Sequence, residues 1–388
     1  MGKAILETCE NYDPQRLTAC LDRIFTALGG MERYVRPGMN VVLKPNLLSA
    51  RKPSDAVTTH PAFVEAVARA VMKAGGVVTI LDSPGGPYTS AWLKRVYAAS
   101  GMETVADAVG AKLNHDLRVE EVPLADGMLL KRVSLLKPIV DADLVINLAK
   151  LKTHMMMVYT GAVKNLFGAV AGTEKADYHA RMHDYDRFAE AICDIHRAAA
   201  PALSLIDGIT AMEGEGPGSG VPRHLGVVIA AENAFDADAL ALRLIHVPWR
   251  KVPIMRAGER GGLFRPESFE ACGVDWESHV CEGFDVPALH LRETGAKPGK
   301  SMLSRLAAKA RPHPVIDAAR CIRCGRCAQA CPVSTIDRMG DGAYQIRVAN
   351  CIRCFCCHEL CPEKAIEIRR GLVSKLLLSP GMSGKRKP

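Results

Sequence analysis

The chain has 388 residues, of which 48% are hydrophobic and 24% charged, and its net charge is +8. This composition is typical of a soluble globular protein and excludes a disordered chain, and the length suffices for one large domain with a small module or for two to three domains. No apolar run approaches the roughly 20 residues of a membrane-spanning helix, and the first 15 residues lack the apolar core of a signal peptide. We therefore expect a cytoplasmic protein without a membrane partner.

Short apolar runs of β type alternate with helical patterns along roughly the first 290 residues. Buried strands are predicted at 40–43, 77–81, 143–147, 203–206 and 225–230, and helices at 61–75, 185–200 and 235–247. Such alternation is typical of parallel strands joined by crossover helices. The sequence thus predicts an α/β domain over residues 1–290, built on a doubly wound, mainly parallel sheet.

Charged and amide side chains stand near the carboxyl ends of these predicted strands. Ligands bind outside those ends in open α/β sheets, and lysines there often serve anions or acid–base chemistry. The candidate site residues are Lys44, Asn46, Asp82, Lys150, Lys152, His154, Lys164 and Asn165. The alternative is that Asp and Asn merely cap helices and turns. The glycine-rich segment 213–223 lacks the ending of a P-loop, and we interpret it as a lid.

Residues 291–312 are predicted to connect this domain to a second one, with a helix at 301–310. Nine of the 14 cysteines then lie between Cys321 and Cys361. Most of the remaining five are interpreted as small buried hydrophobic residues; the five are Cys9, Cys20, Cys193, Cys272 and Cys281. We assign 313–371 to a small α+β domain and 372–388 to a basic tail.

The motif C-x2-C-x2-C-x3-C-P occurs twice in this domain, thirty residues apart. It is the spacing of bacterial two-cluster ferredoxins, in which three close thiolates hold one [4Fe–4S] cluster and the fourth reaches the other. The predicted ligands are Cys321, Cys324, Cys327 and Cys361 for one cluster, and Cys351, Cys354, Cys357 and Cys331 for the other. Zinc is the disfavoured alternative, because structural zinc uses two cysteine pairs separated by a longer loop.

Cys356 is a fifth cysteine within the stretch CIRCFCCHELCP and has no place in the ligand pattern. An alternative ligand, a redox-active thiol and a residue packed near the cluster are all open interpretations, of which we favour packing.

The positive charge is localised in the second domain. From Arg311 onward there are 14 Lys and Arg against 6 Asp and Glu, while the preceding residues carry 36 of each. Two oxidised clusters of about −2 each would lower this excess of +8 to roughly +4. A remaining positive face suits an acidic electron donor or acceptor protein. No nucleic-acid partner is expected, because no recognised binding motif is present.

The stretches VVLKPNLL, TTHP, LDSPGG, INLAKLKTH, TGAVKNLFG, AMEGEGPGSGVPR and CIRCFCCHELCP occur in this order. Together they resemble the domain of unknown function 362 family of iron–sulfur proteins, over about residues 37–370. The resemblance implies an α/β domain followed by a double-cluster ferredoxin module, with iron–sulfur binding and redox work. It also implies that Cys356 beside Cys357 is a family trait. It implies no substrate.

Our hypothesis is an iron–sulfur oxidoreductase whose clusters deliver single electrons to an anionic substrate or cofactor at the strand ends. Lysines at 44, 150, 152 and 164 would neutralise the ligand, and His154 would donate a proton. Asn46 and Asn165 would orient the ligand, and Asp82 would orient it or bind a metal. The alternative is a dedicated electron carrier or assembly partner whose α/β domain docks another protein.

Overall fold

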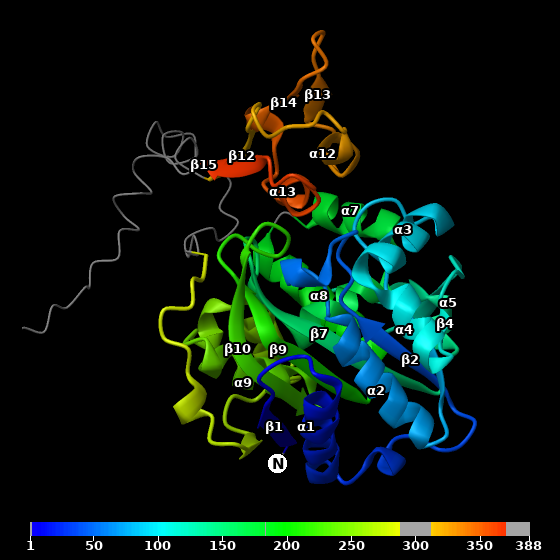
Figure 1. Ribbon diagram of the computed structural model, residues 1–388. Coiled ribbons are helices and arrows are strands. Elements are labelled where there is room, and N and C mark those ends of the chain that lie inside the picture. The colour runs from blue at the N-terminus through cyan, green and yellow to red at the C-terminus, as the bar shows by residue number, and fades with distance from the viewer. Residues whose placement is uncertain (1, 183, 288–311, 370–388) are drawn as a thin grey trace, which may run out of the picture. The chain divides into compact units, whose positions relative to one another are not determined.

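The computed structural model describes residues 2–182, 184–287 and 312–369, which fall into two units, Met1–Leu289 and His290–Pro388 (Figure 1). The predicted helix at 301–310 and the predicted tail lie outside the described residues, as does the predicted linker except for Pro312. His183 is also not described.

The first unit is built on a nine-stranded sheet with the order β11-β1-β10-β9-β7-β2-β3-β4, in which β8 also pairs with β7. The adjacent strands β4, β3, β2, β7 and β9 are parallel, whereas β10 and β8 run antiparallel to their neighbours. The bounds are β1 Gly2–Thr8, β2 Asn40–Pro45, β3 Val77–Ile80, β4 Lys112–Leu113, β7 Leu144–His154, β8 Val158–Thr160, β9 Leu203–Glu213, β10 Val221–Ala231 and β11 Phe269–Gly273. A separate ribbon pairs β5 (Val119–Pro123) with β6 (Arg132–Leu136).

The helices of this unit form two groups, one on each face of the sheet (Figure 1). In one group α2 contacts α1 and α4, and in the other α8 contacts α6 and α10 while α9 contacts α6. The bounds are α1 Pro14–Ala27, α2 Pro61–Lys73, α3 Ser90–Ser100, α4 Met102–Val109, α5 Lys137–Val140, α6 Ala162–Asn165, α7 Gly172–Arg181, α8 Tyr185–Ala199, α9 Ala234–Leu244 and α10 Pro253–Arg260. A mainly parallel sheet between two helix layers confirms the predicted α/β class.

Local sequence signals account for where these elements begin and for their burial. The carboxylate of Asp13 accepts bonds from the backbone N–H groups of Gln15 and Arg16, and Pro14 opens α1 behind it. The strands β7 and β9 are buried along nearly their whole length because helices cover both faces of the sheet.

Strand β7 is longer than the sequence predicted. It continues to His154 instead of ending at 147, because β8 pairs antiparallel with its last residues, Lys152 opposite Thr160. Its two lysines and His154 therefore lie in a buried strand and not in a loop after it. Strand β9 likewise continues past the predicted end at 206 and includes Asp207. Both predicted strands ended at the first polar residues, but the sheet continues there because Lys150 of β7 and Asp207 of β9 form an ion pair.

The second unit repeats its backbone at an interval of thirty residues. Strand β12 (His313–Ile316) pairs with β15 (Ile366–Arg369), and β13 (Ile336–Arg338) pairs with β14 (Tyr344–Ile346). The short helices α12 (Arg326–Gln329) and α13 (Cys356–Glu359) follow equivalent cysteine loops. Left-handed backbone recurs at matching positions: Arg323 and Arg353, Gly325 and Phe355, Ser334 and Lys364. Each strand pair thus joins one strand from each half.

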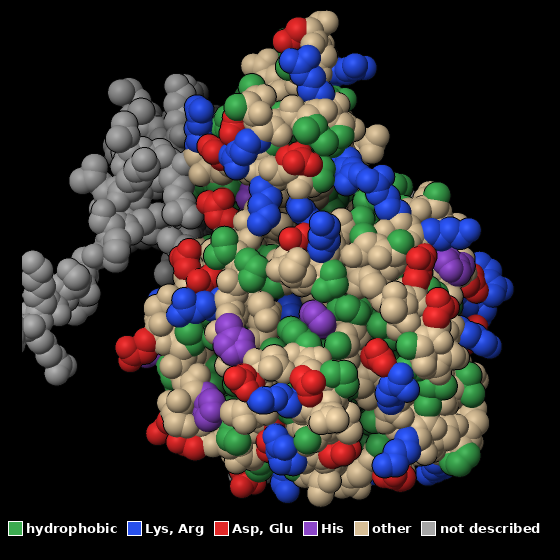
Figure 2. All heavy atoms as spheres, in the orientation of Figure 1, with side chains coloured by type: hydrophobic (Ala, Val, Ile, Leu, Met, Phe, Trp, Pro, Cys, Tyr) green, Lys and Arg blue, Asp and Glu red, His purple; other side chains and the backbone are tan. Residues whose placement is uncertain are grey.

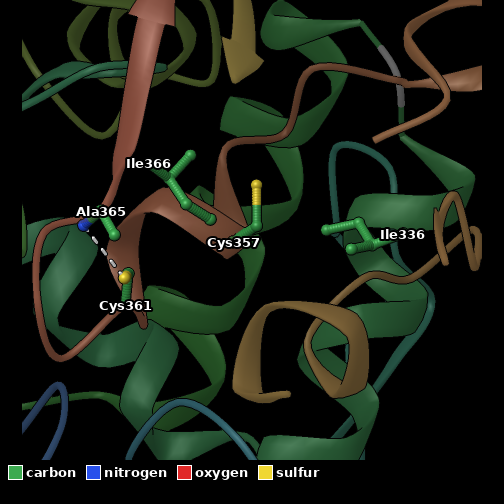
Figure 3. Packing of buried hydrophobic residues seen from close by; sticks show 5 residues of the cluster. All are labelled: Ile336, Cys357, Cys361, Ala365 and Ile366. Carbon is green, nitrogen blue, oxygen red and sulfur yellow. Dashed lines mark hydrogen bonds between the residues drawn. The ribbon is translucent and has the colours of Figure 1, made fainter. Parts of the chain in front are cut away.

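The core of the second unit is small and includes two cysteines. Ile336, Cys357, Cys361, Ala365 and Ile366 are buried together (Figure 3). Because β13 and β15 each contribute an isoleucine, packing in this core ties the two halves together.

Candidate functional site

Two small cavities lie in the second unit, and cysteines from both halves line each of them. The first spans about 350 Å³, part of which is open to solvent, and its cysteines are Cys321, Cys324, Cys327 and Cys361. The second spans about 300 Å³, also partly open to solvent, and its cysteines are Cys331, Cys351, Cys354 and Cys357. Each cavity therefore gathers three cysteines of one motif and the fourth cysteine of the other.

Backbone amides point at several of the cysteine sulfurs. The Sγ of Cys331 lies 3.3 Å from both the amide nitrogen and the hydroxyl of Thr335, and the Sγ of Cys361 accepts the N–H of Ala365 at 3.2 Å (Figure 3). Donors of this kind stabilise negative charge on ligand sulfur. Burial raises the pKa of the free Cys327 thiol to about 11. Iron binding would remove this proton, because the thiolate is the form that binds the metal.

The donor set fits two [4Fe–4S] clusters. Thiolates are the ligands such clusters take, and apolar side chains such as Ile316 and Ile346 line the rest of the two cavities. Among the described residues, no three His, Cys, Asp or Glu side chains converge on one ion position. A cubane does not require such convergence, because each thiolate binds a different iron.

Cys356 is absent from the residues that line either cavity. It is the first residue of α13, at the position that Arg326 occupies in α12 of the other half. Its role remains a prediction.

In the first unit, Lys44 and Asp82 form a buried ion pair at the carboxyl ends of β2 and β3. The Lys44 Nζ lies 2.7 Å from Asp82 Oδ1 and also donates to the Pro45 carbonyl, while Asp82 Oδ2 accepts the Leu47 N–H at 2.7 Å. Burial lowers the pKa of Lys44, and the Asp82 carboxylate opposes that shift. A Cβ at Gly168 would lie 2.0 Å from Asp82 Oδ1, so glycine is what lets that backbone pass over the pair.

Asn165, at the end of α6, connects this pair to further candidate residues. Its Nδ2 donates to the Lys44 carbonyl at 3.1 Å and to Asn147 Oδ1 at 2.8 Å, and its Oδ1 accepts from Asn46 at 3.0 Å. Asn46 Oδ1 in turn accepts from Lys152 Nζ at 2.8 Å. The structure thus brings five of the eight candidates into one hydrogen-bonded network: Lys44, Asn46, Asp82, Lys152 and Asn165.

Lys150 belongs to a second network. Its Nζ lies 2.8 Å from Asp207 Oδ2 and 3.0 Å from the hydroxyl of Tyr12, which itself donates to Asp207 Oδ1 at 2.8 Å. The Tyr12 ring stacks on His60 with centroids 3.6 Å apart. Burial lowers the pKa of Lys150 and, in the same place, the pKa of His60 to about 4. Since Asp207 compensates Lys150, this network adds no uncompensated charge.

The remaining two candidates are held by other contacts. His154 is buried, and its Nδ1 accepts the N–H groups of Met156 and Met157 at 3.1 and 3.3 Å. A neutral ring in that arrangement carries its proton on Nε2. The Nζ of Lys164 lies 5.7 Å from the ring centroid of Phe167.

The sequence did not single out Lys175, which lies in α7 beside this site. Its Nζ donates to the carbonyl of Ser83 and lies 5.8 Å from the centroid of Phe167. The side chain is half-buried, and desolvation of its amine lowers the pKa of Lys175 to about 7. The Asp82 carboxylate opposes this shift, and Lys44 and Lys164 contribute to it more weakly. A charged residue on a surface helix gives no sequence signal for such an environment.

Charges elsewhere on the first unit are mixed. On the face drawn in Figure 2, acidic and basic side chains are interspersed over this unit. Exposed ion pairs such as Arg132–Glu121, with Nη1 and Oε2 3.1 Å apart, are of this kind. The described part of the chain contains no helix long and apolar enough to cross a membrane.

Comparison with known proteins divides the chain in the same way. Residues 41–243 match the model of a domain of unknown function (DUF362), and residues 313–362 match a 4Fe-4S dicluster domain. The thylakoid-associated protein sll1697 of Synechocystis sp. is 37% identical over 259 residues, which are 66% of this chain and 78% of that protein. The lactate racemase apoprotein of Thermoanaerobacterium thermosaccharolyticum matches 52% of this chain and 50% of its own, at a TM-score of 0.33 and 16% identity, a level that carries no information about activity.

The buried pair makes a testable contribution to stability. We expect Lys44→Met to lower the free energy of unfolding by about 3–5 kcal/mol, because Asp82 would be left buried without its cation. The measurement is urea unfolding followed by far-ultraviolet circular dichroism. Lys44→Met combined with Asp82→Asn should be more stable than Lys44→Met alone. The matched control, Arg132→Met, removes an exposed partner and should change little. Equal stability of Lys44→Met and the parent protein would contradict the assignment.

The exchange of cysteines between the halves predicts which cluster each variant loses. Cys361→Ser should lower bound iron from about eight to about four per chain and leave the same spectrum as Cys321→Ser, because both residues line the first cavity. Anaerobic iron and sulfide analysis with electron paramagnetic resonance would measure this. Cys356→Ser is the control and should keep about eight irons. If Cys361→Ser instead matched Cys351→Ser, the ligand exchange would be wrong.

Proposed function

Because this chain belongs to the DUF362 family and carries a 4Fe-4S dicluster domain at residues 313–362, we propose that it is an iron–sulfur redox protein that passes single electrons to an anionic substrate or cofactor held by its first unit. The observation that carries the proposal is the pair of cavities, each lined by three cysteines of one motif and the fourth of the other. Clusters bound there would supply one-electron chemistry.

Buried polar atoms without partners support a ligand site in the first unit. Within the described residues, the Oγ atoms of Ser49 and Ser83, the Oγ1 of Thr58 and the Nδ1 of His179 are buried and make no hydrogen bond. An unsatisfied group of this kind costs about 1–3 kcal/mol unless water or a ligand satisfies it. Ser49 and Thr58 follow β2, and Ser83 follows β3, at the strand ends where α/β folds bind ligands.

The networks around Lys44 and Lys152 give this site a fixed wall. Their charged groups are hydrogen-bonded in place, so they need little reorganisation when a ligand arrives. In the proposal, Asn46 and Asn165 orient the ligand, and His154 is the proton donor. An acidic electron donor or acceptor protein is the expected partner, and the cytoplasmic location stays a prediction.

Native mass spectrometry of protein purified without oxygen tests the proposal. We expect the mass of two [4Fe–4S] clusters together with a small anionic molecule, and reversible one-electron reduction seen by electron paramagnetic resonance. Two reducible clusters with no ligand, and none captured from a panel of anionic metabolites, would favour the electron carrier or assembly partner. Zinc in place of iron would contradict the proposal, because zinc cannot carry electrons.

A further inference from the structure

Three polar groups at or next to Lys175 have unused hydrogen-bonding capacity. The ammonium group has three donors, and within the part of the chain that the structure describes it makes one hydrogen bond, to the Ser83 carbonyl. The Oγ of Ser83, in a residue only 2% exposed, and the Nδ1 of His179, in a residue 7% exposed, have no partner among the described residues. These atoms come from the loop after β3 and from α7.

The ring of Phe167 forms an apolar wall beside these groups. Lys175 Nζ lies 5.8 Å from its centroid, and the His179 ring meets it edge-on at 5.8 Å while stacking on Phe188 at 4.6 Å. The stacking fixes the imidazole, and desolvation together with the nearby lysines lowers its pKa to about 3, so it is neutral at physiological pH. A neutral imidazole can donate a hydrogen bond without adding charge.

The charges around Lys175 favour an anion. Those acting on it are one carboxylate, Asp82 at the end of β3, and two lysines, Lys44 of β2 and Lys164 of α6. Asp82 is already engaged, because it accepts from Lys44 at 2.7 Å and from the Leu47 amide at 2.7 Å. The single negative charge of Asp82 therefore does not balance the positive charges of Lys44, Lys164 and Lys175.

We propose that Ser83, Lys175 and His179 bind the carboxylate or phosphate group of a small ligand against the ring of Phe167. The inference names the ligand class of the site in the proposed function and rests on that function for its biological meaning, although binding itself requires no electron transfer. Lys175 is half-buried, so part of its side chain contacts solvent.

Binding at this site takes up a proton. Without a ligand the pKa of Lys175 is about 7, and an adjacent anion raises it. Below pH 7 the amine is already charged and affinity is constant. Above pH 7 the amine must gain a proton on binding, so affinity falls by up to about tenfold per pH unit until the pKa of the complex is reached.

The experiment is calorimetric titration of the cluster-loaded protein with sulfate and with succinate, both of which keep their charge from about pH 6.5 to pH 9. Buffers of different ionisation enthalpy measure the proton uptake. Saturable binding that weakens above pH 7 with proton uptake is the expected result. Tighter sulfate binding would indicate a phosphate ligand, and tighter succinate binding a carboxylate ligand.

Variants separate the charge of Lys175 from its place in the fold. Lys175→Met should weaken binding at least tenfold at pH 6.5, whereas Lys175→Arg should bind without the pH dependence, because arginine stays charged. Lys94→Met, an exposed lysine of α3, is the matched control and should bind like the parent protein. Iron content and circular dichroism verify that each variant is folded and loaded.

The absence of saturable binding of either anion to the parent protein would overturn the inference, as would unchanged binding by Lys175→Met or an unchanged pH dependence in Lys175→Arg. The proposed function can fail separately. A protein that binds the anion in this pH-dependent way but has clusters that cannot be reduced would contradict the redox role and leave the binding site standing.

Discussion

The buried pair of Lys44 and Asp82 is the interaction on which the strand ends of the first unit, where we propose a ligand site, depend. Taking two such charges out of water costs several kcal/mol for each ion, and they persist inside a fold only when their hydrogen bonds are complete. Here the lysine reaches two carbonyl or amide oxygens besides the carboxylate, and the carboxylate takes a backbone amide. The lysine of the pair also holds Asn165 through its Oδ1, and the backbone can pass closely over the pair because residue 168 is glycine.

A second compensated pair, Lys150 with Asp207, lies on the neighbouring strands β7 and β9, where the two residues are directly opposite in register. In both pairs the charge of the lysine is already neutralised by an aspartate. Either lysine could neutralise a ligand only after its ion pair had opened. Lys175 differs, because its amine bonds to a neutral carbonyl and its pKa lies near 7. The fold thus combines lysines paired with carboxylates and one lysine whose pKa lies near 7.

The sequence predicted the fold class because apolar β-type runs and helical patterns are local features. The cysteine ligand sets stay a prediction, made from spacing that cluster geometry constrains. The sequence did not predict the end of β7, since Asn147, Lys150 and Lys152 interrupt the apolar run although pairing with β8 and β9 continues the strand. Nor did it find Lys175 or Tyr12. Their surroundings are assembled from residues distant in the chain, as when Tyr12 meets Asp207. Composition and hydrophobic periodicity do not show which side chains are desolvated by residues distant in the sequence.

The two halves of the second unit show how strongly the cysteine loops dictate backbone shape. Gly325 adopts a left-handed conformation at φ 76°, and a Cβ there would lie 2.7 Å from the hydroxyl of Tyr344. The equivalent residue of the other half is Phe355, which takes the same conformation at φ 61°. Such backbone costs a residue with a side chain about 1–2 kcal/mol. Phe355 adopts this conformation despite the cost. We infer that the loop has to turn at this position, whatever its side chain, for three cysteines to face one cavity.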